Sequence, residues 1–423
     1  MRHPTDKKTV RTTLRSLPWA MAVMLCTSSL SGHAQQGLQS LLDKALFQHP
    51  TVLQARNQAK ASGFERTSAQ WSRFPTLSSE LRSENGPSQN ITRLEQPLWT
   101  GGKITGQVRA AEANERVALA QVDEAELNVL TQAATAFFEV LRQQARLDGA
   151  VLNVAEHERL LALIERRTRA EISPPADETL AQARLQQAVS ERIQITRQRD
   201  AARVTLHQWI GEAVGPIAAP KAIAFVRPNS EVQMLEQARE ASPAFRRLQA
   251  QIEAAEAQIA VSQAQAMPNV VLGHQRIWGY LYAGQLADKT YLSLQYTPGA
   301  GLSALSNRQV AVSRLEAARS EMGSLQLNIE AQVRSTLTEL DAMAAQLEPA
   351  RVLLGGTAEV VESYLRQYQI GRKNWLDVLN AQREKTNALY NLADMQYGLQ
   401  LAQVRLMIQT GELRSDALTA IHD

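Results

Sequence analysis

The sequence predicts a mainly α-helical fold with paired β-strands, built as two copies of one helix–hairpin–helix plan. Three observations support this prediction: long stretches rich in Ala, Gln, Leu, Arg and Glu, short alternating segments that occur in pairs, and an internal repeat. Aromatic residues make up 5% and hydrophobic residues 44% of the 423 residues. This composition suits long helices packed through narrow apolar seams, and it does not suit several thick globular cores.

The repeat is visible in the spacing of prolines and small residues. Ala45–Pro50 (ALFQHP) and Ala238–Pro243 (AREASP) are each followed, 25 residues after their proline, by another proline, Pro75 or Pro268. Farther along, the two copies match at an offset of 200 residues, which pairs Asp177 with Asp377, Leu206 with Leu406 and Gly211 with Gly411. Such an ordered set indicates a duplication.

The duplication divides the chain into five segments. Residues 1–34 are a predicted signal peptide, 35–215 are repeat 1, 216–228 are an inter-repeat linker, 229–412 are repeat 2, and 413–423 are a C-terminal tail.

Each repeat has the same expected elements in the same order. Helices are expected at 51–72 and 244–266, and each follows a proline, which suits a helix start. Alternating polar and apolar residues then predict β-hairpins at about 74–98 and 269–297. Long helical hairpins follow at about 102–212 and 303–411. Their tips are marked by Ser173-Pro174-Pro175 and by Ile370-Gly371-Arg372.

The N-terminus has the three parts of a secretory signal. Basic residues are followed by a short apolar run, Leu17–Leu25, and Gly32-His33-Ala34 favours cleavage after Ala34. The alternative is a membrane anchor, although the run is too short to span a bilayer as a helix. The only cysteine, Cys26, lies inside this segment, so the mature chain is expected to contain no disulfide and no thiolate metal site.

The sequence predicts neither an enzyme nor a nucleic-acid-binding protein. Its 45 basic and 42 acidic residues are interspersed, whereas nucleic-acid binding requires a clustered basic face. We find no nucleophile elbow, phosphate loop or dinucleotide fingerprint, and the histidines lack metal-ligand spacing. No cofactor or metal is therefore expected.

The four predicted strands have the length of tilted membrane-spanning strands. Four strands cannot close a barrel, and open strand edges do not occur in lipid, so an oligomer would have to close it. Three subunits would supply twelve strands, an even number within the range of outer-membrane barrels. A simple elongated bundle without a lumen remains the alternative interpretation.

Two segments resemble a known family. LEQPLWTGGKITGQVRAAEA at Leu94–Ala113 is similar to the strand-to-helix junction of TolC-like outer-membrane efflux and secretion proteins. YQIGRKNWLDVLNAQREKTNALYNL at Tyr368–Leu392 resembles a second segment of the same family. The resemblance covers the mature chain and implies a homotrimer with a twelve-strand transmembrane β-barrel and a twelve-helix periplasmic tube. It also implies an equatorial band of smaller elements, to which the linker and the C-terminal tail would belong.

The resemblance also implies a role and partners. The protein would be a passive exit duct in the cell outer membrane with a periplasmic extension, in contact with outer-membrane lipid. It would dock to an inner-membrane transporter through a periplasmic adaptor, the membrane fusion protein. The LEQPLWTGG junction and the SPPAD tip favour type I protein secretion over small-molecule efflux. The alternatives are a periplasmic coiled-coil adaptor and a structural coiled-coil protein.

The same resemblance suggests site residues. Asp377, Asn380, Tyr368 and Lys373 match positions at the periplasmic entrance, where Asp377 would contribute to a ring of carboxylates. Relatives often have a second acid where this chain has Asn380, so the ring would carry less charge. The alternative roles are a helix-start Asp that favours the helix dipole, a surface aromatic and a solvated lysine.

The hairpin tips are the second group of expected site residues. In the family the tips meet the adaptor, which points to Ser173, Pro174, Pro175, Ile370, Gly371 and Arg372. The nearby basic run Arg166, Arg167 and Arg169 is interpreted as a solvated face.

Overall fold

The computed structural model describes residues 37–83, 88–220, 222–227, 230–297, 299–301, 303–413 and 421–422. The predicted signal peptide with Cys26, its cleavage after Ala34 and the turn at residues 84–87 lie outside these ranges. Residues 35–423 form one compact unit, and the description below concerns that unit.

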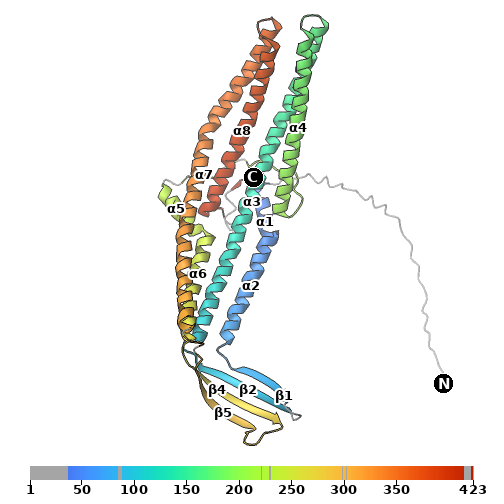
Figure 1. Cartoon of the computed structure of the whole chain (residues 1–423). Coiled ribbons are helices and arrows are strands. Elements are labelled where there is room, and N and C mark those ends of the chain that lie inside the picture. The colour runs from blue at the N-terminus through green and yellow to red at the C-terminus, as the bar shows by residue number, and fades with distance from the viewer. Residues whose placement is uncertain are drawn as a thin grey trace, which may run out of the picture. The chain divides into compact units, whose positions relative to one another are not determined.

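Helices in repeat 1 are arranged around one very long helix. They are α1 (Leu38–Gln48), α2 (Pro50–Trp71), α3 (Lys103–Arg169) and α4 (Pro175–Ile210). With 67 residues, α3 is about 100 Å long at about 1.5 Å per residue. It packs against α2 over the part that begins at the strands and against α4 over the part that reaches the tip (Figure 1).

The helices of repeat 2 follow the same order. They are α5 (Glu231–Ala241), α6 (Pro243–Ala264), α7 (Ser303–Gln369) and α8 (Trp375–Thr410). α7 continues through Pro349 and α3 continues through Gly149, so neither residue ends a helix. The two repeats meet where α3 packs against α6 and α8.

The helices predicted at 51–72 and 244–266 are present as α2 and α6, but most of ALFQHP and of AREASP lies before them. In the structure each segment ends a separate helix, α1 or α5, and the backbone is extended at His49 and Ser242. The cause is Pro50 or Pro243, because the residue before a proline is disfavoured in the helical conformation. The proline itself opens the next helix, where its missing N–H costs nothing.

A four-stranded antiparallel sheet joins the two repeats. Its strands are β1 (Thr76–Ser83), β2 (Ser88–Trp99), β4 (Asn269–Gly279) and β5 (Asp288–Gln295), in the order β1-β2-β4-β5. The register pairs Leu77 with Leu94 in the first hairpin and Val270 with Leu294 in the second. β2 and β4 pair across the repeats, so that Leu94 lies opposite His274.

The two faces of this sheet differ in chemistry. Exposed leucines share one face because cross-strand partners point to the same side: Leu77, Leu81, Leu94, Leu272, Leu292 and Leu294. The opposite face carries a polar network in which the Tyr291 hydroxyl donates to Glu95 (2.8 Å) and Arg93 contacts Glu80 (3.2 Å). The predicted alternation of apolar and polar residues is therefore present in the folded sheet.

The linker and the tail meet in a second, two-stranded sheet. β3 (Ala222–Ile223) pairs antiparallel with β6 (Ile421–His422). This pairing joins two segments that the sequence analysis assigned to one band. It lies beside the largest core, where α1, α3, α4 and α8 bury Phe137 and Phe138.

Within the described ranges, no helix is both long enough and apolar enough to cross a membrane.

Candidate functional site at the helical hairpin tips

The two helical hairpins end in the same backbone turn. Glu171 in the first tip and Gly371 in the second both adopt a left-handed conformation, with φ of 57° and 75°. In the first tip the Ile172 amide donates to the carbonyl of Arg167 (2.9 Å), and in the second the Arg372 amide donates to that of Gln367 (2.8 Å). These pairs are related by the 200-residue offset, so the repeat extends to individual hydrogen bonds.

A buried contact ties one tip to the other. The Ser173 and Tyr368 hydroxyl oxygens lie 2.9 Å apart, and both residues are buried. Arg167 donates from Nε to the Ser173 hydroxyl (3.2 Å), and its guanidinium lies 4.9 Å from the centre of the Tyr368 ring. The two hairpins are therefore linked by a three-residue contact, which we call the tip lock (Arg167, Ser173, Tyr368).

An apolar cluster supports the tip lock. The rings of Tyr368 and Trp375 are 5.0 Å apart, and Trp375 is only 2% exposed. The cluster draws residues from α3, α4, α7 and α8: Leu160, Ile164, Ala181, Leu365, Val378 and Leu379. Tyr368 is thus not the surface aromatic of the alternative interpretation. Whether it holds an entrance shut stays a prediction.

Asp377 has a local structural role. Its carboxylate accepts from the Asn374 amide (3.3 Å) in a capping box at the start of α8, which satisfies an otherwise unpaired helix-end donor. Lys373 lies 3.8 Å from the Asp377 carboxylate and 4.2 Å from the centre of the Tyr364 ring. The helix-start interpretation of Asp377 is therefore realised, and it does not exclude a further role at an entrance.

The remaining predicted tip residues are distributed around the turns. Pro174 is the N-cap residue of α4, and Pro175 is its first residue. Ile370, Gly371 and Arg372 are exposed, as is Ile172, which the sequence analysis did not select. Arg167 was also missed as a site residue, because a run of three arginines gives no indication of which one turns inward. Asn380 is half-buried, one turn beyond Asp377.

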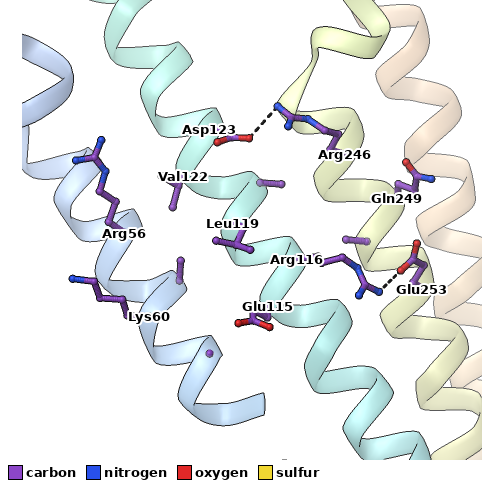
Figure 2. A pocket seen from close by; sticks show the side chains of 14 residues that line it. Arg56, Lys60, Glu115, Arg116, Leu119, Val122, Asp123, Arg246, Gln249 and Glu253 are labelled. Carbon is purple, nitrogen blue, oxygen red and sulfur yellow. Dashed lines mark hydrogen bonds and ion pairs between the residues drawn. The ribbon is translucent and has the colours of Figure 1, made fainter. Parts of the chain in front are cut away.

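A separate groove lies between α2, α3 and α6 (Figure 2). Its volume is about 750 Å³, and ion pairs between α3 and α6 border it: Arg116 with Glu253, and Asp123 with Arg246 (3.0 Å). Lys60 of α2 also lines it and forms no ion pair with any described residue. No group of three or more His, Cys, Asp or Glu in the described ranges is arranged to hold a metal ion.

Comparison with known proteins identifies the family. Residues 41–212 and 234–412 match the outer membrane efflux protein family, one match for each half of the chain. The chain belongs to the outer membrane efflux protein family. Its TolC-like fold and its place in the outer membrane follow from this membership.

Individual members of the outer membrane efflux protein family are distant in sequence. Protein CyaE of Bordetella pertussis is 28% identical over 56% of this chain and 54% of that protein, so the match spans about half of its length. The cobalt-zinc-cadmium resistance protein CzcC of Cupriavidus metallidurans is 24% identical over 73% of each chain. A membrane protein from Pseudomonas aeruginosa of known crystal structure has a TM-score of 0.79 at 19% identity, covering 88% of this chain and 93% of that one.

Proposed function

We propose that three copies of this chain form one closed channel, the exit duct of a tripartite export system. The observation that carries this proposal is the sheet: β1 and β5 are its two edges, each paired on one side only. Unpaired strand edges are not tolerated in lipid, so the edges of neighbouring copies must pair. Exposed leucines would face lipid, and the network of Arg93 and Glu95 would face the lumen.

The duplication predicts which residues meet. Within the chain Leu94 of β2 lies opposite His274 of β4. Leu294 is the equivalent of Leu94 in the second repeat, because α7 begins 9 residues after Leu294 and α3 begins 9 residues after Leu94. Leu81 is the equivalent of His274 in the first repeat, because the two are 193 residues apart, as are Pro75 and Pro268. If copies repeat the internal contact, Leu294 of one chain lies opposite Leu81 of the next.

The helices give an independent indication of the same arrangement. The Arg116–Glu253 ion pair joins α3 to α6. At the 200-residue offset, the equivalent of Arg116 is Glu316 of α7. At the 193-residue offset, the equivalent of Glu253 is Lys60 of α2. The equivalent contact between copies therefore keeps a basic and an acidic partner with the signs exchanged. Both are exposed in the single chain: Glu316 pairs with Arg319 of its own helix (3.1 Å), and Lys60 forms no ion pair with any described residue. In the assembly each would gain a partner from the neighbouring copy.

Disulfide cross-linking tests this assembly, because the mature chain is expected to lack cysteine. The variant with both Leu81→Cys and Leu294→Cys, oxidised in the outer membrane, should give cross-linked dimers and trimers on denaturing gels. Each single variant is the matched control and should give neither ladder. Monomer alone from the double variant, when correctly inserted, would reject the proposed edge pairing.

A charge exchange tests the helical part. Lys60→Glu should weaken the trimer, because two carboxylates would then face each other between α7 and α2. Adding Glu316→Lys should restore it. Exposed ion pairs contribute about 0.2–1 kcal/mol each, so the readout is trimer survival over a temperature series. Loss that the second substitution does not rescue would contradict the proposed contact.

We place the periplasmic entrance at the hairpin tips. At the 200-residue offset, Lys373 is the equivalent of Ser173 and Thr168 is the equivalent of Tyr368. If neighbouring copies repeat the internal Ser173–Tyr368 contact, Lys373 of one chain contacts Thr168 of the next. Six contacts of two kinds would then close the entrance, with Asp377 and Asn380 lining it. Opening would require both kinds to separate, a two-state change in helix packing.

The tips are also where the adaptor would bind. Ile172 and Ile370 are 63% and 66% exposed beside the turns, and Ser173, Pro174, Pro175, Gly371 and Arg372 complete the surface. Apolar side chains exposed at a fixed turn are suited to a partner that covers them. An inner-membrane transporter behind the adaptor would supply the energy.

For the cargo we propose a secreted protein over small molecules. The support is the LEQPLWTGG junction and the SPPAD tip. Deleting the gene should remove one or more proteins from the culture medium and leave sensitivity to drugs and metal ions unchanged. The opposite pattern would assign the protein to small-molecule or metal efflux, and a water-soluble monomer would favour the adaptor alternative.

A further inference from the structure

A polar cluster is buried where the two repeats meet, about four helical turns from Arg167 of the tip lock along α3. The side-chain oxygen Oδ1 of Asn153, on α3, accepts hydrogen bonds from Gln382 Nε2 (3.0 Å) and from the Thr386 hydroxyl (2.9 Å), both on α8. All three residues are at least 92% buried. We call the contact between these two helices the α3–α8 seam. Elsewhere near the tips it is made of aliphatic and aromatic side chains.

His157 lies in this seam one turn after Asn153. It is 6% exposed, and its Nδ1 has no hydrogen-bond partner among the described residues. With Asn153 and Thr386, it lines a small polar cavity of about 40 Å³ between α3, α4 and α8. The His157 side chain is therefore largely removed from solvent and faces only a small polar space.

The charged groups around His157 do not favour its protonation. Glu156 lies next to it on α3, Arg184 and Glu191 face the cavity from α4, and Arg383 faces it from α8. Two positive and two negative charges leave no excess of carboxylate to stabilise an imidazolium. Burial lowers the pKa of His157 below its ordinary value; Arg184 lowers it further, and Glu156 acts in the opposite direction.

We propose that His157 is a proton-binding site that loosens the α3–α8 seam in mild acid. Protonation would place an unpaired cation in the buried cluster, and the cluster would relieve it by opening toward water. The sign follows from the lowered pKa. The packed seam is fully stable above the ordinary value of 6.5 and loses stability as pH falls below it, because the loosened state binds the proton more tightly.

The repeat confines this response to contacts inside each chain. The equivalent of His157 in the second copy is Thr357, which does not titrate. A seam formed by α7 with the next copy would therefore keep its packing in acid. The consequence for the periplasmic entrance, that the two tips of one chain separate more readily as pH falls, rests on the proposed function; the loosening of the seam does not.

Hydrogen exchange on the detergent-solubilised full chain tests the loosening. After correction for the intrinsic effect of pH, exchange in peptides that cover residues 150–165 and 378–390 should rise at least about threefold between pH 7.5 and 5.5. His157→Gln should abolish the rise, and His207→Gln, at an exposed histidine of α4, should keep it. An equal rise in wild type and in His157→Gln would overturn the proposal.

A measurement without mutation guards against misfolding of the variant. Exchange of the imidazole C2 proton, followed by mass spectrometry on the wild-type protein, gives the pKa of each histidine. His157 should titrate below the ordinary imidazole value of 6.5, and titration at or above that value would overturn the proposal. Absence of channel conductance at every pH would instead count against the proposed function and leave this inference standing.

Discussion

Removing one hydroxyl group should make the proposed entrance leak. Tyr368→Phe deletes the hydrogen bond between Tyr368 and Ser173 (2.9 Å) and keeps the ring that packs on Trp375. The Ser173 hydroxyl remains paired with Arg167, so no buried group is left without a partner. The loss should therefore equal the net value of one hydrogen bond, about 1 kcal/mol per chain.

This value can be converted into an opening probability. About 1 kcal/mol changes an equilibrium roughly fivefold, because about 1.4 kcal/mol corresponds to a factor of ten. If the three tip locks of a trimer open together, their sum of about 3 kcal/mol raises the open population roughly a hundredfold. Single-channel recording in planar bilayers would measure that ratio directly.

A matched control separates the hydroxyl from a general effect of the substitution. Tyr364 is half-buried on the same helix, and its hydroxyl forms no hydrogen bond with any described residue, so Tyr364→Phe should leave the recording unchanged. Ser173→Ala should have at least as large an effect as Tyr368→Phe, because it also removes the Arg167 contact, and the double variant should add little to Ser173→Ala. An unchanged open probability in Tyr368→Phe, or full additivity with Ser173→Ala, would refute the tip lock as a gate.

Three further predictions concern stability. Gly106→Val should separate α3 from α6, because a new Cβ would lie 2.8 Å from a Val261 methyl. Gly323→Ala is the control and should be neutral or stabilising, because a Cβ added there would meet no neighbouring atom within 4 Å. The two variants can be compared by the temperature at which the trimer dissociates. His49→Ala should cost about 1 kcal/mol by removing the N-cap of α2, and His49→Asn should restore it. Since burial lowers the pKa of His49, the wild-type cap should weaken as pH falls below 6.5, whereas the Asn cap should not, as urea titrations at two pH values would show. Asp377→Asn should weaken the start of α8 by about 0.5–1 kcal/mol, seen as faster exchange of its first amides. Unchanged exchange would contradict the capping role.

The sequence predicted the helical hairpins well because their ends carry strong local signals. Proline or glycine stands at every tip and strand junction, and the seams have helical spacing. The separate helices α1 and α5 were missed, because a proline that starts one helix also ends the one before it.

The tip lock could be predicted only in part. The position of Tyr368 followed from a resemblance, but its partner Ser173 lies 195 residues away and no local pattern connects them. Arg167 became a candidate only when the fold placed it over the Tyr368 ring. The repeat offset, carried through to single residues, is the sequence signal that would have found the paired turns.

The histidine found only in the first copy has a consequence for a ring of duplicated subunits. Such a ring has joints of two alternating kinds, one inside each polypeptide and one at each boundary between polypeptides. Because His157 occupies the first kind and Thr357 would occupy the second in the proposed trimer, selection can adjust the two kinds independently. The proposed trimer would then contain six similar joints, of which only three respond to pH.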